Sequence, residues 1–429
     1  MPFYSTNQNS PVVSLREAVF RGLPPDNGLY MPTEIPVLPE SFFKDLPQLS
    51  LKEAGVEVSK ALLGDEVDAT SLETIVSDAL DFPTPIIRLD ESTSVLELFH
   101  GPTLAFKDVG ARFMAQLMGH FLEKEEKELH ILVATSGDTG SAVAQGFLGV
   151  EGIHVTILYP KGKVSHIQEQ QLTTNGQNIT ALEIDGTFDD CQAMVKQAFL
   201  DTELNQKLRL TSANSINVSR LIPQSFYYFF AAGQVGWEEP LTFITPSGNF
   251  GNLCGGLLAA KMGLPVSHFI AATNTNAVFP EYIRTGEYLP QPSVRTVANA
   301  MDVGKPSNFA RLQELFDKDY EKVVKHVSST SVKDNTIREV IAAVHQKHDY
   351  VLCPHTATGY KAWTDLGPAL GGQGVILSTA HPCKFGDVVN PIIEQEVAIP
   401  ERLQAIVDRK KQAIELPSDY ATFKNYLMS

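Results

Sequence analysis

The sequence predicts an α/β protein in which a parallel sheet is covered by helices. Short apolar runs, often β-branched, each end in a polar turn and lead into an amphipathic stretch. Four such units begin near residues 129, 153, 241 and 268. Repeated strand–turn–helix units put ligands outside the carboxyl ends of the strands. The polar turns are therefore the places where chemistry is expected.

Composition and charge restrict the class of protein. The chain has 429 residues, 43% of them apolar and 20% charged, which is typical of a globular protein with two or three domains. A net charge of −16 disfavours a nucleic-acid partner, because a phosphate backbone needs a basic face, and it favours a small ligand. The most apolar run, 226–237, is shorter than the ~20 residues that span a membrane.

The cysteines indicate the compartment. Four cysteines are widely spaced and form no CxxC pair, so neither a disulfide framework nor a cysteine zinc site is expected. The N-terminus lacks the basic start and apolar stretch of a secretory signal. We therefore expect a cytoplasmic protein.

The chain divides into three expected segments. Residues 1–92 read as a helical accessory domain, in which Thr70 and Glu73 take the positions of a capping box. Residues 93–400 hold the α/β region, expected as two subdomains, and 401–429 form a helical tail. The charged run at 123–129 is expected to be a solvated helix end. No chemistry is visible in the accessory segment.

Lys107 lies between Phe106 and Asp108 in the mostly apolar stretch FHGPTLAFKDVGARF. An ammonium among apolar neighbours loses hydration, which lowers its pKa and makes the neutral amine available for Schiff-base chemistry. Taken alone, the stretch favours an ordinary lysine that lays its stem on apolar surface and keeps its charge in water. The other turns have to decide between these two interpretations.

Two glycine-containing turns could bind anions. PSGNFGN at 246–252 lies between a strand and a helix pattern, where backbone N–H groups and the helix dipole suit a cofactor phosphate. It is neither a dinucleotide fingerprint nor a P-loop, and it could be only a tight connection. TSGDTGS at 135–141 could hold a substrate carboxylate through Ser136 and Thr139, or one of its hydroxyls could cap the helix.

A third polar turn carries an arginine. SANSINVSRL at 212–221 offers Asn214, Ser215 and Arg220, and Lys163 lies in the turn PKGKVS. Arginine suits bidentate recognition of a phosphate. A lone arginine in a polar turn is more often a surface residue, so this site depends on its context.

The remaining polar ends contain histidines and a threonine. His355 and His381 have no partners at metal-ligand spacing, so no metal site is expected. Thr379 follows a strand and could hydrogen-bond a ring nitrogen of a cofactor, or it could cap the next turn.

Taken together, these motifs resemble one family. HGPTLAFKD, TSGDTGSA, NSINVSR, PSGNFGN and STAHPCKF, in this order, closely resemble the threonine synthase family of pyridoxal-phosphate enzymes of fold type II. The resemblance covers nearly the whole chain, because REAVFRGLPPDNGLYMP is similar to the family's N-terminal domain. It implies a fold like the tryptophan synthase β subunit, with two α/β layers around the cofactor and a helical N-terminal domain.

The resemblance assigns roles to residues of this chain. It implies that Lys107 forms the Schiff base with pyridoxal 5′-phosphate and that Thr379 faces the pyridine nitrogen. The residues expected around the cofactor phosphate are Gly248, Asn249, Phe250 and Gly251. The residues expected to bind the substrate are Ser136, Gly137 and Thr139 for its carboxylate, and Lys163, Asn214, Ser215 and Arg220 for its phosphate.

Three positions depart from the pattern of related enzymes. Related enzymes often carry Asn where this chain has Asp138; the acidic residue is typical of the threonine synthase family, but its contact with the cofactor stays open. Asn252 replaces an acidic residue, and Cys383 stands where Ala is frequent. Neither of these last two changes touches a proposed catalytic atom, so we expect activity to survive both.

The activity that the resemblance implies is that of a carbon–oxygen lyase in threonine biosynthesis. It would convert O-phospho-L-homoserine and water into L-threonine and phosphate by β,γ-elimination and water addition. The alternatives are a phospho-lyase that releases 2-oxobutyrate, a serine/threonine dehydratase, and a non-catalytic phosphate-binding protein. A dehydratase is disfavoured because an unphosphorylated substrate gives Arg220 no partner. The oligomeric state stays open.

Overall fold

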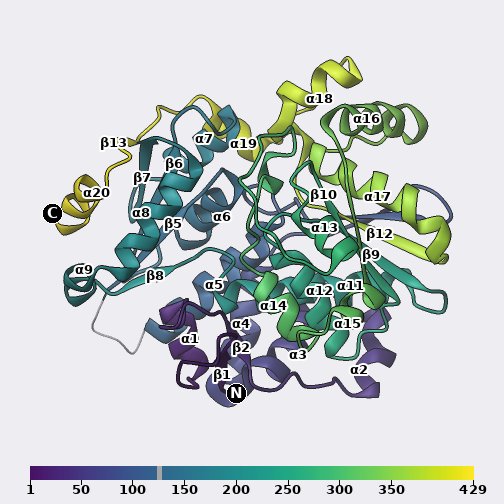
Figure 1. Cartoon of the computed structure of the whole chain (residues 1–429), viewed down its shortest axis with the longest axis horizontal. Helices are drawn as coiled ribbons and strands as arrows, with labels where there is room; N and C mark the ends of the chain where they lie inside the picture. The colour runs from purple at the N-terminus through teal and green to yellow at the C-terminus, as the bar shows by residue number, and fades with distance from the viewer. Residues whose placement is uncertain (123–127) are drawn as a thin grey trace.

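The computed structural model describes residues 1–122 and 128–429. Two β-sheets and their helices form two α/β layers, and the N-terminal elements lie together beneath them in the view of Figure 1. Most of the charged run predicted as a helix end, 123–127, lies outside the described residues.

The larger sheet has six strands in the order β11-β10-β9-β12-β4-β3. All neighbours are parallel except β3, which is antiparallel to β4. Its strands are β3 (Ile86–Arg88), β4 (Thr93–Glu97), β9 (Leu241–Pro246), β10 (His268–Thr273), β11 (Val327–Ser331) and β12 (Gln373–Ser378).

The smaller sheet has five strands in the order β13-β7-β6-β5-β8, all of them parallel. Its strands are β5 (Leu129–Ala134), β6 (Ile153–Pro160), β7 (Ile179–Asp185), β8 (Leu210–Ser212) and β13 (Ile414–Pro417). The predicted units near 129 and 153 lie in this sheet, and those near 241 and 268 lie in the larger one. The predicted parallel arrangement is confirmed, but it is divided between two sheets.

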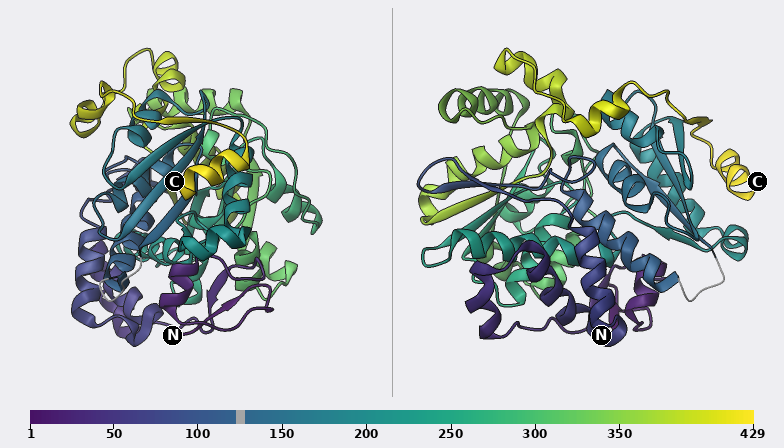
Figure 2. Two further views of the ribbon diagram at one scale, coloured as in Figure 1. Left: turned by 90° about the vertical axis from the view of Figure 1, so that its left-hand side faces the viewer. Right: turned by 180° about the vertical axis from the view of Figure 1, so that it is seen from behind.

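Burial on both faces explains the apolar strands. Every residue of β9 is buried, as a strand must be when helices cover both faces of a parallel sheet. α12 (Gly251–Lys261) is buried from Gly251 to Ala259, which fits its apolar composition on all sides. The two further views in Figure 2 show helices packed along the sheets.

The N-terminal segment combines helices with a small sheet. β1 (Phe3–Ser5) and β2 (Tyr30–Pro32) pair antiparallel, which a purely helical interpretation misses because each strand has only three residues. The helices of this segment are α1 (Leu15–Arg21), α2 (Glu40–Asp45), α3 (Leu51–Leu63) and α4 (Ala69–Ala79).

The predicted capping box at Thr70 and Glu73 is wrong. Asp68 caps α4, and its carboxylate accepts a hydrogen bond of 3.0 Å from the Ser71 backbone N–H. Asp68 precedes the first helical residue directly, so its short side chain reaches the unpaired N–H groups of the first turn. A capping box does form at α3, from Ser50 and Glu53.

The C-terminal segment returns to the smaller sheet. β13 lies between α19 (Glu401–Val407) and α20 (Tyr420–Met428) in the chain, and it pairs with β7 at the sheet edge. The segment predicted as a helical tail therefore contains a strand. The division of the chain at residues 92 and 400 stays a prediction.

The other helices complete the layers. They are α5 (Lys107–Leu122), α6 (Asp138–Phe147), α7 (His166–Thr173), α8 (Phe188–Leu200), α9 (Thr202–Lys207), α10 (Val218–Leu221), α11 (Phe226–Val235), α13 (Val278–Thr285), α14 (Phe309–Leu315), α15 (Tyr320–His326), α16 (Asp334–His348), α17 (Pro354–Leu370) and α18 (Gly386–Ile393). Short 3₁₀ helices are η1 (Leu46–Gln48), η2 (Gly64–Glu66), η3 (Ile222–Ser225), η4 (Asn299–Met301) and η5 (Pro382–Phe385). No helix of the described residues is long and apolar enough to cross a membrane.

Candidate active site

A cavity of about 750 Å³ lies where turns from the two sheets meet. It is lined by residues that follow β5, β8, β9 and β12, as expected for a ligand site at the carboxyl ends of parallel strands. The predicted site residues that line it are Lys107, Ser136, Thr139, Asn214, Ser215, Arg220, Gly248, Asn249, Phe250, Gly251 and Thr379.

Two predicted site residues do not line the cavity. Gly137 is buried behind the cavity wall at φ +135°, and its N–H donates to Thr135 Oγ1 at 3.0 Å, so it shapes the turn. Lys163 lies exposed on the turn after β6, where its N–H donates to the Pro160 carbonyl. The structure therefore places Lys163 outside the group of residues that meet at the cavity.

Lys107 is positioned by a pairing of two loops. The Phe106 N–H donates to the Thr379 carbonyl at 2.9 Å, and the His381 N–H donates to the Leu104 carbonyl at 3.1 Å. This pairing puts Lys107, the first residue of α5, next to the loop that carries Thr379. The two predicted cofactor contacts come from segments more than 270 residues apart, yet they lie side by side.

The surroundings of Lys107 favour its neutral amine. Burial lowers the pKa of Lys107 to about 8, and the positive charges of Arg220 and Lys384 act in the same direction. Asp138 opposes this effect, because its negative charge raises the pKa of Lys107. An amine with a pKa near 8 is partly deprotonated at neutral pH, as a nucleophile or base requires.

The turn at 246–252 presents backbone donors. Among the described residues, no acceptor contacts the N–H groups of residues 248–251, and α12 begins directly behind them. Phe250 adopts the left-handed conformation at φ +61°, which turns the backbone into the start of α12. Free N–H groups at a helix N-terminus are suited to a phosphate.

Gly248 needs to be glycine for steric reasons. A Cβ atom at this position would lie 2.9 Å from the Met301 Cα and 3.0 Å from the Ala300 carbonyl oxygen, both of them backbone atoms. The turn therefore packs directly against the loop at 299–303. This close packing brings its donors to the cavity wall.

The side chain of Asn249 links the turns instead of facing an anion. Its Nδ2 donates to Ser215 Oγ at 3.1 Å, and its Oδ1 accepts from the Ser307 N–H. Asn308, which the sequence did not single out, also donates to Ser215 Oγ at 3.1 Å and to the Asn249 carbonyl at 2.9 Å. Ser215 is thereby held beside the 246–252 turn.

The turn at 135–141 has a different internal structure. Thr135 Oγ1 accepts hydrogen bonds from the N–H groups of Gly137 at 3.0 Å and Gly140 at 2.9 Å. Of the hydroxyls that could cap α6, that of Thr135 takes an N–H of the first turn, because Gly140 lies in this turn, while the N-cap residue Gly137 has no side chain. Within the described residues the hydroxyls of Ser136 and Thr139 have no protein partner, and both line the cavity.

Arg220 is buried, with 3% of its surface exposed. Nη1 donates to the Ala213 carbonyl at 2.5 Å, while Nε has no partner among the described residues. Burial lowers the pKa of Arg220 to about 10, and Asp108 acts against this shift. A buried guanidinium with an unused N–H group favours an anionic ligand.

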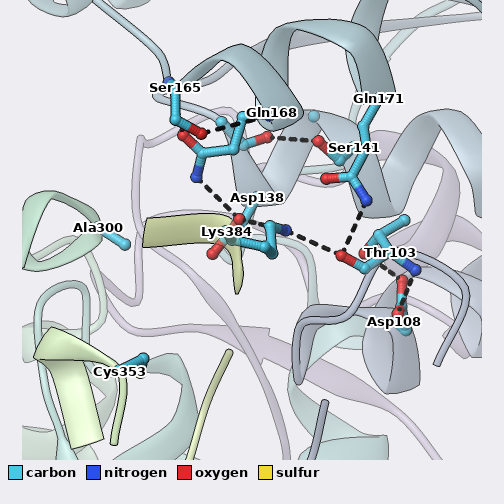
Figure 3. Close-up of polar contacts among 12 residues, drawn as sticks. Thr103, Asp108, Asp138, Ser141, Ser165, Gln168, Gln171, Ala300, Cys353 and Lys384 are labelled. Atoms are coloured by element: carbon cyan, nitrogen blue, oxygen red, sulfur yellow. Dashed lines mark hydrogen bonds and ion pairs between the residues drawn. The ribbon is translucent and has the colours of Figure 1, made fainter. Parts of the chain in front are cut away.

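Two further residues act at or near the cavity. From the sequence, His355 was weighed only as a metal ligand, and Lys384 was not singled out. His355 lines it, and its Nε2 accepts from the Ala300 N–H at 3.1 Å, so the ring carries its proton on Nδ1. Burial lowers the pKa of His355 to about 4, which keeps the ring neutral. Lys384 forms an ion pair with Asp138 (Figure 3). A lysine within STAHPCKF carries no local signal that it is buried.

The fold and the cavity define the class of the protein, a pyridoxal-phosphate-dependent enzyme of fold type II. The family model described as "Pyridoxal-phosphate dependent enzyme" matches residues 79–379. Models described as "Threonine synthase N terminus" and "Threonine synthase, C-terminal" match residues 2–80 and 356–427. The chain belongs to the threonine synthase family.

Sequence relatives and solved structures agree with this assignment. Threonine synthase of Escherichia coli K12 is 41% identical over 432 residues, with 100% of both chains covered. The crystal structure of the Escherichia coli enzyme superimposes with a TM-score of 0.93 at 40% identity, covering 100% of this chain and 99% of that one. A PLP-bound threonine synthase from Brucella melitensis gives 0.94 at 34% identity, covering 100% and 98%.

A more distant structure shows the shared fold. Threonine deaminase isoform 2 of Solanum lycopersicum matches with a TM-score of 0.54 at 16% identity, and it covers 73% of this chain and 85% of its own. At this identity the likeness concerns the fold alone. The predicted family, fold class and cofactor are confirmed by these comparisons together.

The residues present fit pyridoxal phosphate. The 246–252 turn offers unused N–H groups and lacks a Cβ where one would collide with backbone, which suits a phosphate. The Thr379 hydroxyl has no partner among the described residues, and it lies beside Lys107 at the cavity wall. The phosphate, the ring nitrogen and the aldehyde of the cofactor would each meet a suitable group.

Proposed function

We propose that this chain converts O-phospho-L-homoserine and water into L-threonine and phosphate. Its membership of the threonine synthase family supports this activity. The observation that carries it is the buried, incompletely paired guanidinium of Arg220 in the same cavity as Lys107. A substrate without a phosphate would leave this charge uncompensated, which disfavours a dehydratase.

Bound pyridoxal phosphate supplies an aldehyde for the substrate amine and an electron sink for a carbanion. Lys107 would hold the cofactor covalently through its amine, and the same amine, when free and neutral, would remove the Cα proton of the substrate. The lowered pKa of Lys107, about 8, makes this amine available. The amine belongs to the first residue of α5, and the loop pairing at Thr379 holds it in place.

The polar turns bind and orient the substrate. The hydroxyls of Ser136 and Thr139 donate to its carboxylate, with the turn kept in shape by Gly137. Asn214, Ser215 and Arg220 bind its phosphate and stabilise the charge that develops as this group leaves. Lys163 lies outside the cavity and is not needed for this arrangement.

Thr379 has a different task. Its hydroxyl can hydrogen-bond the pyridine nitrogen but, being neutral, it does not hold that nitrogen firmly protonated. Once the phosphate has left, release and hydrolysis of the unsaturated substrate before water adds at Cβ would give 2-oxobutyrate and ammonia, so the site has to retain this substrate and admit water only at Cβ. This step separates the proposed synthase from a phospho-lyase.

The experiment that tests the proposed function is incubation of the holoenzyme with O-phospho-L-homoserine, with threonine, 2-oxobutyrate and phosphate measured together. Equal amounts of threonine and phosphate are expected. Phosphate with 2-oxobutyrate would instead identify a phospho-lyase, and the absence of all three products would support a binding protein.

Lys107→Ala tests the covalent role. Turnover should fall at least ~10³-fold, because both the attachment point and the base are lost. Borohydride should bleach the yellow wild-type holoenzyme and leave cofactor mass on Lys107, and it should label nothing in the variant. Lys161→Ala is the control, since Lys161 is an exposed lysine paired with Glu415 at 2.6 Å and should be dispensable. Equal losses in both variants would contradict the role of Lys107.

The compartment is also a proposal. All four cysteines are buried and free, which supports a reducing, cytoplasmic location. Fractionation of cells that produce the native protein checks this, and recovery of the activity outside the cytoplasm would contradict it.

A further inference from the structure

The proposed function leaves a buried ion pair unexplained. Lys384 and Asp138 are 1% and 4% exposed, and Lys384 Nζ lies 2.6 Å from Asp138 Oδ1. Taking both charges out of water costs several kcal/mol per ion, so a buried pair is weak evidence for a purely stabilising role. Neither residue lines the cavity, but both act on the charge of Lys107, which does, so the pair has a place in the chemistry of the site.

The pair joins the segments that build the site. Lys384 Nζ also donates to the Thr103 carbonyl at 2.9 Å, in the loop that leads to Lys107. Asp138 begins α6, and its Oδ1 accepts from Gln168 Nε2 at 2.9 Å. Figure 3 shows the contacts of Lys384 with both Asp138 and Thr103. Lys384, in η5 after β12, therefore links this segment to the loop before α5 and to the first residue of α6.

The charged groups that act on Lys107 come from several elements. Asp138 attracts its ammonium, while Arg220 and Lys384 repel it. His355 is also nearby, but its ring is neutral. Asp108, its neighbour in α5, accepts from the Thr103 N–H at 2.9 Å and from the Thr103 hydroxyl at 2.7 Å, so it is occupied locally. Asp138 is thus the carboxylate that competes for the Lys107 proton.

Asp138 is ionised in this setting. Burial alone would raise the pKa of Asp138, but the ammonium groups of Lys384 and Lys107 together hold it well below its usual range. A buried carboxylate without Lys384 would be left with Lys107 as its cationic neighbour. It would then keep Lys107 protonated, which opposes the role of a neutral amine.

We propose that Lys384 is a positioning residue that holds the Asp138 carboxylate, limits its attraction for the Lys107 ammonium, and so keeps the Lys107 amine ready to react. Asp138 attracts both Lys384 and Lys107. Its direct ion pair with Lys384 compensates most of its negative charge. This inference rests on the proposed role of Lys107 as an amine that reacts in its neutral form. It gives the acidic residue of TSGDTGS a function that does not require contact with the cofactor.

The test measures the proton affinity of Lys107 in the cofactor-free protein. The pH dependence of its acetylation by trace acetic anhydride, followed by mass spectrometry of the Lys107 peptide, gives its pKa directly. In Lys384→Met this pKa should rise by about one unit or more, which slows acetylation near neutral pH about tenfold. In Asp138→Asn the pKa should fall, because the attractive charge is lost.

A double variant protects the test against misfolding. Lys384→Met with Asp138→Asn leaves no uncompensated charge, so it should fold even where a single variant does not. Because the attraction by Asp138 outweighs the repulsion by Lys384, the pKa of Lys107 in the double variant should lie below wild type and above Asp138→Asn. A pKa in the double variant equal to or above that of the wild type would overturn the proposal.

Two further variants separate this role from a structural one. Lys384→Arg keeps the charge, so it should bring the pKa of Lys107 back toward the wild-type value. Lys411→Met is the matched control, since Lys411 pairs with Glu169 at 2.9 Å and Glu183 at 2.6 Å and does not act on Lys107. It should leave acetylation of Lys107 unchanged.

The outcomes are distinct. An unchanged or lower pKa of Lys107 in folded Lys384→Met, or a higher one in Asp138→Asn, would refute the inference. The measurement uses neither cofactor nor substrate, so it can fail while the borohydride test of Lys107 succeeds. Conversely, the expected order of pKa values without borohydride labelling would refute the proposed function and leave the coupling of Asp138 and Lys384 established.

Discussion

The two glycine-containing turns have similar sequences but different donors. At 246–252 the backbone N–H groups are unused among the described residues and lie at the start of α12. At 135–141 Thr135 Oγ1 already accepts from the N–H groups of Gly137 and Gly140, so the side chains of Ser136 and Thr139 are the groups left for a ligand. One turn follows a strand of the larger sheet, the other a strand of the smaller.

This difference shows that the ligand a glycine-rich turn can bind depends on whether its N–H groups are free or already hydrogen-bonded within the turn. Several free backbone donors at a helix N-terminus suit the oxygens of a phosphate. Two hydroxyls on a turn that is fixed by its internal hydrogen bonds suit the smaller, planar carboxylate. We therefore expect variants of the first turn to change cofactor binding and variants of the second to change substrate binding.

Among the variants that compare the two turns, the largest effect is expected at Gly248. Gly248→Ala puts a Cβ 2.9 Å from the Met301 Cα, and displacement of the turn should cost about 1–3 kcal/mol, a loss of roughly 10- to 100-fold in cofactor affinity. Titration of the apoprotein with pyridoxal phosphate measures this loss. Gly251→Ala is the control, because its Cβ would lie 3.4 Å from Ser215 Cβ in ordinary contact. Equal affinities in both variants would remove the steric argument.

A similar but substrate-specific effect is expected at Arg220, which supplies the positive charge that both turns lack. Arg220→Lys loses the planar fork, so the KM for phosphohomoserine should rise roughly tenfold or more. Cofactor affinity should stay at the wild-type value. Steady-state kinetics and the same cofactor titration check the two parts. A loss of cofactor affinity alone would assign Arg220 to the first turn instead.

Loss of the hydrogen bonds that Thr135 Oγ1 accepts within the 135–141 turn should lower the stability of the protein. Thr135→Val leaves the buried N–H groups of Gly137 and Gly140 without their acceptor, which should lower the free energy of unfolding by about 1–3 kcal/mol. Thr139→Val removes a hydroxyl that has no partner among the described residues, so stability should change by less than about 0.5 kcal/mol. Urea unfolding of the two apoproteins compares them. Equal stabilities would show that Thr135 does not brace the turn.

The smallest effect is expected at Ser136. Ser136→Ala removes one donor to the substrate carboxylate, so the KM should rise about two- to tenfold with cofactor affinity unchanged. A lower affinity for the cofactor with an unchanged KM would instead assign the 135–141 turn to the cofactor. The comparison of KM with cofactor affinity is therefore the decisive measurement.

Local patterns predicted a large part of the fold. The strands at 129, 153, 241 and 268 follow from apolar runs that end in polar turns, because a parallel strand is buried on both faces. Very short elements were not predicted, because strands of three residues such as β1 and β2 are too short to show a sequence pattern. The cap of α4 was misplaced because Asp68, Thr70 and Glu73 all offer side chains suited to a helix start, and only the backbone shows which one is used.

The sequence by itself determined the order of the polar turns and the family, and it singled out Lys107 as the candidate nucleophile, because these depend on residue types within short stretches. The tertiary structure alone decided that the turns of two separate sheets face one cavity, that Lys163 lies outside it, and that Asn308 positions Ser215. It also paired Lys384 with Asp138 across 246 residues of chain (384 − 138). A buried charge is unfavourable unless it is paired, and its partner can lie anywhere in the chain. A local sequence pattern therefore cannot identify the pair.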